Sequence, residues 1–192
     1  FPYTTLFRSS ELTAYAKANP GRISFASAGT GGLAHLGMEM YKQVSGTDVL
    51  HVPYKGSSGA VNDLISGQVS ALFSSLPSLQ GLVDKGYVRL LAATAPSSSP
   101  ATRQLPLMSA SLPGYEYATW YGMYVPASTP TALVERMNLA LNRALKQSAL
   151  VAKVEAAGTE LHPGTPDDVL QWTRRDTDKW QRVIQSANIR VD

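Results

Sequence analysis

Cysteine is absent from this sequence of 192 residues, and no apolar run approaches the roughly 20 residues that a membrane-spanning helix needs. The lack of cysteine excludes disulfides, thiolate catalysis and thiolate metal sites, although it does not choose between cytoplasm and periplasm. Charged residues are also sparse, at 16%, and the 17 basic ones are dispersed. No basic stripe therefore suits a nucleic-acid backbone, and the formal net charge of +3 leaves only a mild preference for small anions. The hydrophobic residues, at 44%, are enough to bury a core as one or two domains.

The amino terminus has none of the anatomy of a signal peptide, because no charged region is followed by a continuous apolar run. Back-translated, residues 1–9 match the reading of a common sequencing adapter. We therefore expect them to be a sequencing or cloning scar, with the genuine sequence beginning inside a longer open reading frame. A native, frayed terminus is the alternative.

From Glu11 to about Thr94, short β-prone runs alternate with helical patterns, and glycine marks each switch. This rhythm predicts βαβ units, a parallel sheet and right-handed crossovers. The expected strands are 23–27, 48–53, 69–73 and 88–94, and the expected helices between them are 33–44, 58–65 and 78–84.

The second half of the chain has a different pattern. Residues 95–114 contain four prolines and are expected to be a surface excursion and a candidate domain boundary. Residues 120–126 then predict an aromatic-rich strand. Three helices are expected after it, from Thr129-Pro130 as N-cap and first residue to about 146, from 149 to 157, and from Thr165-Pro166 onward, where Asp168 completes a capping box.

Two of these helices carry an apolar stripe at helical spacing, which predicts a buried face. Because only one predicted strand is near enough to cover them, part of their sheet is expected to be missing from this chain. The stripes are Leu133, Met137, Ala140, Leu141, Ala144 and Leu145 on the first helix, and Val169, Trp172, Trp180, Val183 and Ile184 on the last.

Three consecutive predicted strands each end in a loop of small polar residues: 27–32, 54–59 and 74–78. The carboxyl ends of parallel strands meet at one edge of a sheet, where a ligand crevice is expected. Glycines at 29, 31 and 32 allow the backbone to approach a ligand, and the following helix presents unpaired N–H groups and its positive end. The sequence therefore predicts a site for a carboxylate or a phosphate, with hydroxyls and Lys55 as further contacts.

Each element of this site also has a plainer interpretation. The glycine loop lacks the G-x-G-x-x-G spacing and has no Walker lysine, so on its own it indicates a tight turn. His35, on the first turn of the next helix, either reaches a ligand or caps and packs, and Lys55 is equally a solvated loop lysine. The three scattered histidines have no metal-ligand spacing, and Gly56–Ala60 fails G-x-S-x-G, so neither a metal nor a hydrolase triad is expected.

Five stretches occur in an order that is specific as a set, although each alone is not. The set resembles the Bug, or TctC-like, extracytoplasmic solute receptors of tripartite tricarboxylate transporters, over essentially everything after Ser10. The resemblance implies an α/β, periplasmic-binding-protein-like (type II) fold with a doubly wound parallel sheet, in which two lobes hold an organic anion between them. The stretches are Ala16–Gly21, Ser27–Gly32 with His35-Leu36, His51–Gly56, Asp63–Val69, and Leu112–Tyr115 before Trp120–Gly122.

The resemblance also implies how the chain divides. Residues 10–118 are expected to form a complete second lobe, and residues 119–192 the C-terminal part of a first lobe that is otherwise missing. Many relatives have Asp-Asn where this chain has Ser74-Ser75, so we expect a plain carboxylate rather than an amino acid as the ligand. The family's ligand contacts fall on Ser27, Ala28, Gly29, Thr30, Gly31, Gly32, His35, Tyr54, Lys55, Gly56, Ser57, Ser74 and Ser75.

The expected function is periplasmic capture of a small organic anion, a di- or tricarboxylate or an aromatic carboxylate, and its delivery to a membrane permease. The protein is expected to be a monomer with no cofactor, no metal and no nucleic-acid partner. An effector-sensing domain of a transcription regulator is the main alternative, because such domains share this architecture; an upstream signal peptide or helix-turn-helix distinguishes the two. An enzyme is a more distant alternative, which turnover of the ligand would reveal.

Overall fold

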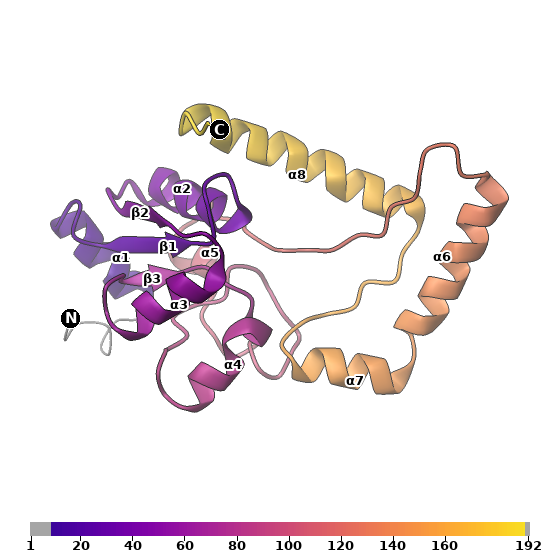
Figure 1. The fold of residues 1–192 in the computed structure, drawn as a ribbon, viewed down its shortest axis with the longest axis horizontal. Coiled ribbons are helices and arrows are strands. Elements are labelled where there is room, and N and C mark those ends of the chain that lie inside the picture. The colour runs from indigo at the N-terminus through magenta and orange to yellow at the C-terminus, as the bar shows by residue number, and fades with distance from the viewer. Residues whose placement is uncertain (1–8, 191–192) are drawn as a thin grey trace.

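A three-stranded parallel sheet organises the first half of the chain in a computed structural model that describes residues 9–190. The strands lie in the order β2-β1-β3, and both pairings are parallel (Figure 1), so the predicted sheet is confirmed over three of its strands. The expected scar at 1–9 falls almost wholly outside the described residues. The strands are β1 (Ser24–Ser27), β2 (Leu50–Pro53) and β3 (Ala71–Leu72).

Helices connect these strands as the sequence predicts. The helix after β1, α2 (Leu33–Ser45), ends where expected. Gly46 takes the left-handed conformation there (φ 64°), and its amide donates to the Lys42 carbonyl at 2.9 Å. The βαβ organisation is therefore confirmed. In chain order the helices are α1 (Ser9–Ala18) before the sheet, α2 (Leu33–Ser45) from β1 to β2, α3 (Ser57–Ile65) from β2 to β3, and α4 (Leu76–Asp84) after β3.

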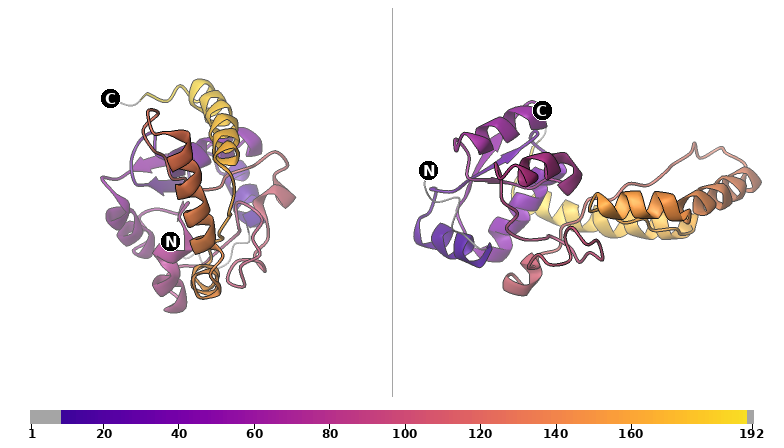
Figure 2. Two further views of the ribbon diagram at one scale, coloured as in Figure 1. Left: turned by 90° about the vertical axis from the view of Figure 1, so that its right-hand side faces the viewer. Right: turned by 90° about the horizontal axis from the view of Figure 1, so that it is seen from below.

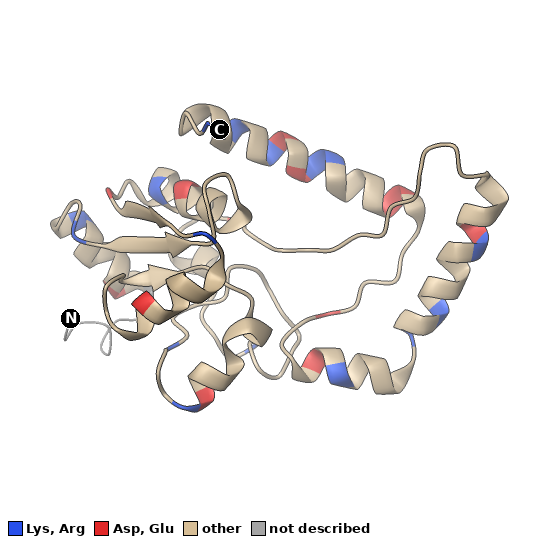
Figure 3. Cartoon of the chain, in the orientation of Figure 1, with Lys and Arg blue, Asp and Glu red and all other residues tan. Residues whose placement is uncertain are grey.

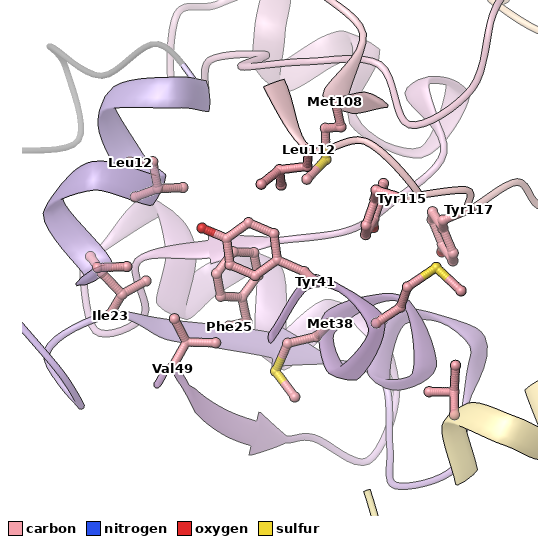
Figure 4. Close-up of a cluster of buried hydrophobic side chains, with 13 residues drawn as sticks. Leu12, Ile23, Phe25, Met38, Tyr41, Val49, Met108, Leu112, Tyr115 and Tyr117 are labelled. Carbon is pink, nitrogen blue, oxygen red and sulfur yellow. The ribbon is translucent and has the colours of Figure 1, made fainter. Parts of the chain in front are cut away.

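The core lies between the sheet, α1, α2 and the segment that follows α5 (Met108–Ser111), as Figure 4 shows. The ring of Phe25, on β1, lies 5.5 Å from that of Tyr41 and 5.3 Å from that of Phe73. The Tyr115 hydroxyl donates to the Gly37 carbonyl at 3.2 Å, which ties residues far apart in the chain. Burial of aromatic and aliphatic side chains, at about 1.5–3 kcal/mol each, is the main source of stability of this unit.

Residues 88–94, predicted as a fourth strand, form no strand, and this prediction is wrong. The described structure has only an isolated parallel bridge there, between Ala93 and Leu107. The apolar residues that suggested a strand are used differently, because Leu91 and Ala92 pack against the core. These apolar side chains are partly buried by packing, although the backbone that carries them is not hydrogen-bonded into the sheet.

Residues 95–114 are largely irregular, as predicted, but they are not simply a surface excursion. Met108 and Leu112, around α5, are buried in the core. Ser99 is fully buried, and its hydroxyl donates to the Glu155 carbonyl at 2.7 Å. The segment therefore joins the sheet unit, which we define as residues 9–117, to the later helices.

Residues 120–126, predicted as a strand, are extended but unpaired, and this prediction is also wrong. A strand needs a neighbour to receive its hydrogen bonds, and no described segment pairs with this one. Its side chains are accordingly open to solvent, with Tyr121 91% exposed. Trp120 is held from outside the segment, by its Nε1–H, which donates to Asp176 at 2.8 Å.

Three further helices and their connections make up an arm, residues 118–190, that projects from the sheet unit (Figure 2). The capping box of the last helix is confirmed: Asp168 N donates to Thr165 Oγ1 at 3.2 Å, and Thr165 N donates to Asp168 Oδ2 at 2.7 Å. The first helix begins one residue later than predicted, with Pro130 rather than Thr129 at the N-cap. The helices are α6 (Thr131–Leu145), α7 (Ser148–Ala156) and α8 (Pro166–Ser186).

The apolar faces predicted on the arm are largely uncovered within residues 9–190, where no sheet packs on them. No residue of α6 or α7 is buried, and of the five residues expected on α8 only Val183 is buried. The end of α8 meets the sheet unit, where the Trp180 ring lies edge-on to Tyr117 at 6.2 Å and Gln43 donates to Ser186 at 2.7 Å. Elsewhere in the arm the apolar contacts are local, such as that of the Trp120 and Trp172 rings at 6.1 Å, and no described sheet covers the helices.

Acidic and basic side chains are interspersed along the helices, as Figure 3 shows most clearly on α8. Among residues 9–190, no helix is both long and apolar enough to cross a bilayer. Buried charge is rare, and Asp176 is the clearest case. Burial alone would raise the pKa of Asp176, but hydrogen bonds from Trp120 and Lys179 outweigh burial and hold that pKa below its ordinary value.

Candidate functional site

The carboxyl ends of the three strands meet at one edge of the sheet, because all three run parallel with β1 in the middle (Figure 1). The loops that follow them are adjacent. The amide of Tyr54, after β2, donates to the Ser27 carbonyl at 2.9 Å, and that of Gly56 donates to the Ala28 carbonyl at 3.0 Å. The predicted convergence of strand-end loops is therefore present.

Three helices start at this edge without a side-chain cap. Their N-cap residues are Gly32 for α2, Gly56 for α3 and Ser75 for α4, and none of these accepts an amide on its side chain. Helices α6 and α7 also lack a side-chain cap, and α8 begins with a complete capping box, so what distinguishes this edge is that several uncapped N-termini meet there. The first-turn amides and positive ends of α2 and α3 thus remain available to an anion, whereas Pro77 removes one donor from α4.

A pocket of about 40 Å³ lies between these loops. It is far smaller than the roughly 300 Å³ or more of a typical small-molecule pocket. The pocket is lined by Ala26, Ser27, Ala28, Ser57, Ala60, Val61, Leu72, Phe73 and Ser74.

In the loop after β1, Ser27 is buried and its hydroxyl is already engaged. Its Oγ donates to the Gly29 carbonyl at 3.0 Å, accepts the Gly29 amide at 3.3 Å, and lies 2.6 Å from Nε2 of His51. Gly31 has φ 76°, which side chains disfavour. Ser27 thus shapes the loop from below, while Ala28, Thr30 and Gly32 are exposed on it.

His35 lies under this loop, not on its surface. The residue is 6% exposed, and Nδ1 accepts the Gly31 amide at 3.0 Å. Its ring stacks on that of His51, with centroids 3.8 Å apart and planes within 7°. Burial lowers the pKa of His35, and burial followed by the charge of His35 lowers the pKa of His51 to about 4. Both rings are therefore neutral at pH 7.

In the loop after β2, Tyr54 is fixed by the following helix. Its hydroxyl donates to Asp63 Oδ2 at 2.6 Å, and this hydrogen bond to the carboxylate raises the pKa of Tyr54. A Cβ at Gly59 would come 3.0 Å from the Tyr54 ring, so the ring packs tightly against α3. Gly56 has φ 105°, a conformation that favours glycine, and Lys55 beside it is exposed.

In the loop after β3, Ser74 and Ser75 are both exposed. Ser75 Oγ lies 2.8 Å from Ser78 Oγ, so this hydroxyl has a local partner, while Ser74 borders the small pocket. The structure thus places all thirteen predicted residues at or directly beneath one edge. Three of them, Ser27, His35 and Tyr54, have polar atoms that are hydrogen-bonded within the protein, which distinguishes them from the exposed residues of the loops.

Sequence reasoning missed two residues that support the site, His51 and Asp63. His51 was set aside because its spacing to the other histidines fits no metal site, and the pairing across β1, α2 and β2 is not visible in spacing. No group of three His, Cys, Asp or Glu residues within 9–190 is arranged to hold a metal ion.

A second hollow, of about 580 Å³, lies along α8 in the arm, beside the extended segment 118–124. It is open, mostly apolar, and bordered by Trp120, Trp180 and Asp176. The sequence offered no sign of it, because the predicted strand at 120–126 was expected to pair rather than to line a groove.

Parallel βαβ units whose strand-end loops and uncapped helices meet at one edge define the α/β lobe of a periplasmic-binding-protein-like fold. The sequence model of the tripartite tricarboxylate transporter family receptor matches residues 1–189. The chain belongs to this family, which is one of solute-binding receptors.

Individual relatives agree with this membership. A UPF0065 protein from the tcbD-tcbE intergenic region of Pseudomonas sp. strain P51 is 34% identical over 95% of this chain and 55% of its own length. The structure of R. palustris Rpa4515 with adipate has a TM-score of 0.84 and 29% identity over 96% of this chain and 62% of that one. The structure of the periplasmic binding protein BugD has a TM-score of 0.79 and 28% identity, over 98% of this chain and 63% of that one. The chain thus spans little more than half the length of these proteins.

Proposed function

We propose that this chain is the larger part of an extracytoplasmic receptor that captures a small organic anion, a carboxylate, for a tripartite tricarboxylate-type transporter. The observation that carries the proposal is the meeting of two uncapped helix N-termini, those of α2 and α3, with glycine-containing strand-end loops at one edge. Backbone amides and helix dipoles there favour a negative group without a full countercharge. The adipate in Rpa4515 supports the same ligand class.

In this proposal, residues 10–118 are the second lobe and residues 119–192 contribute to the first. The pocket at the edge takes one end of the ligand, and the other lobe would close over the remainder, with closure read by a membrane permease. The site would lie in the periplasm, and the receptor would act as a monomer without chemical conversion of its ligand.

The ligand in this proposal is a plain carboxylate, without an amine. Ser74 and Ser75 at the third loop are neutral hydroxyls, so this loop supplies no carboxylate to pair with an ammonium group. Hydroxyls at 57 and 74 border the pocket and can donate to carboxylate oxygens. A preference for an amino acid over its deaminated analogue would contradict this assignment.

The test is a thermal-shift screen of the full-length receptor, with the first lobe restored upstream of this chain, against adipate, other di- and tricarboxylates, aromatic carboxylates and amino acids. A ligand at 100 times its dissociation constant adds about 2.7 kcal/mol, which raises the melting temperature by several degrees. A shift confined to carboxylates, with the compound recovered unchanged, is expected. No shift with any anion would contradict the proposal.

A charge variant locates the site. Ser57 is the first residue of α3, so Ser57→Glu places a carboxylate where the anion is proposed to bind, at a helix position that tolerates acid. We expect it to abolish the carboxylate-induced shift without lowering the melting temperature of the unliganded protein. Thr131→Glu makes the same change at the first residue of α6 and is expected to bind as the parent does. If both variants lost the carboxylate-induced shift equally, the anion would not bind at the start of α3.

A further inference from the structure

Two histidines hold the loop after β1 from beneath, at two points. Nδ1 of His35, on α2, accepts the Gly31 amide at 3.0 Å, and Nε2 of His51, on β2, lies 2.6 Å from Ser27 Oγ. The two rings are stacked face to face at 3.8 Å. The pair therefore fixes the loop where it leaves β1 and again just before α2 begins.

The contact to Gly31 dictates the protonation state of His35. A backbone N–H only donates, so Nδ1 of His35 must carry a lone pair, and the proton of the neutral ring sits on Nε2. That nitrogen faces Glu39 Oε1 at 3.7 Å. A second proton would go to Nδ1, where it would face the Gly31 N–H, donor against donor, and the loop would lose this bond.

We propose that His35 is a positioning residue of the carboxylate site, which holds the Gly31 segment of the loop only while its ring is uncharged, with His51 stacked on it as a brace. This inference rests on the proposed function, since it concerns how the same edge binds its anion. It has a consequence for acidity: carboxylate binding is at full strength when His35 is neutral and weakens as His35 takes up a proton.

The charged groups around the pair set the direction of the effect. On α2, Glu39 favours the charged form of His35 and Lys42 opposes it, while His51 on β2 lies against the ring. Ser27 on β1 and the Gly31 amide are uncharged. Burial outweighs Glu39 and lowers the pKa of His35 below its ordinary 6.5, so binding is retained near neutrality and lost as the pH falls through that lowered pKa.

Two substitutions distinguish the role of His35 as a hydrogen-bond acceptor from the effect of protonating its ring. His35→Asn places an amide oxygen near the position of Nδ1, so it keeps an acceptor for Gly31 but does not titrate. His35→Phe keeps a ring against His51 but removes the acceptor. His162→Asn is the matched control, because that side chain is 72% exposed and lies in the arm.

The first measurement is hydrogen exchange of the Gly31 amide, which needs no ligand. We expect slow exchange in the parent chain, in His35→Asn and in His162→Asn, and faster exchange in His35→Phe. The second is the adipate affinity of the full-length receptor between pH 7 and about 5.5, compared among variants at each pH, so that protonation of adipate itself affects all of them equally and cancels in the ratio. We expect His35→Phe to bind about tenfold more weakly at pH 7, the loss of one hydrogen bond to a loop amide.

The acid dependence provides the sharper readout, because a role in packing alone would not produce it. Adipate affinity should fall equally with acidification in the parent and in His162→Asn, and less steeply in His35→Asn, where only protonation of adipate remains. An equally steep fall in His35→Asn would overturn the proposal, even if His35→Phe does not fold. Unchanged Gly31 exchange in a folded His35→Phe would overturn it too. If the full-length parent receptor binds no carboxylate, the proposed function fails, and the exchange measurements alone decide whether His35 positions the loop.

Discussion

Helix α2 of the sheet unit and helix α6 of the arm are equally amphipathic, yet only α2 is packed into a core. In residues 9–117, Phe25, Met38 and Tyr41 are buried against one another from different elements. In residues 118–190, Leu133 of the α6 stripe is 44% exposed and α6 buries nothing. An apolar stripe thus indicates that a helix face favours burial, but the face is buried only where a second surface packs against it.

The largest expected effect tests this contrast directly. Phe25→Ala removes a ring that is 4% exposed and should lower the free energy of unfolding by about 3–5 kcal/mol, because the cavity cannot collapse fully. Leu133→Ala, in the apolar stripe of α6, removes a side chain that is 44% exposed and should cost less than about 0.5 kcal/mol. Urea unfolding of the two variants measures both. Similar losses would mean that the arm has a core of its own.

A medium effect is expected on acidification, which should destabilise the sheet unit through its partly buried His51. The folded-state pKa of His51 is lowered from 6.5 to about 4, so the unfolded chain binds the proton more readily in between. Stability should therefore be unaffected above pH 6.5 and decline by about 1–2 kcal/mol as the pH falls from 6.5 toward 4. Comparing unfolding curves of the parent and His51→Gln across this range checks the sign. A decline of the same size in His51→Gln would assign the acid sensitivity to other groups.

The smallest expected effect lies in the arm. Thr165→Ala removes the hydroxyl that accepts the Asp168 amide at the start of α8 and should cost about 0.5–1 kcal/mol. Because the contacts of the first turns of α8, such as Trp172 with Trp120, lie within the arm, the loss should appear as faster amide exchange at the beginning of α8, with the sheet unit unchanged. Protection lost equally in β1 would show that arm and sheet unit unfold together. Thr165→Ser, which keeps a hydroxyl, serves as the control.

How much of this structure was predictable differs between local and long-range features. Helix ends were predicted well, as at Gly46 and Thr165, because caps depend on residues within one turn. The strands of the βαβ units were also predicted, since each lies between two glycine-marked switches. Residues 120–126 were not, because β-propensity describes a strand's side chains and says nothing about the presence of a partner strand.

The candidate site shows the same division. The loops at 27–32, 54–59 and 74–78 could be assigned to one edge from topology alone, because parallel strands align their carboxyl ends. The roles of the residues within them could not. His35 and His51 are far apart in sequence, and only the packing of α2 over β2 stacks their rings. Tyr54 likewise carried no sign that its hydroxyl would be bonded to Asp63.

The sequence by itself determined the alternation of strands and helices, the helix ends and the gathering of polar loops at one edge, since each follows from local pattern and from the chirality of βαβ connections. Only the tertiary structure decided which apolar faces are buried and which polar groups are bonded within the protein. Both depend on a partner that arrives from elsewhere in the chain. For that reason the sheet unit, whose elements supply one another's partners, is well packed, whereas the arm leaves its apolar stripes exposed.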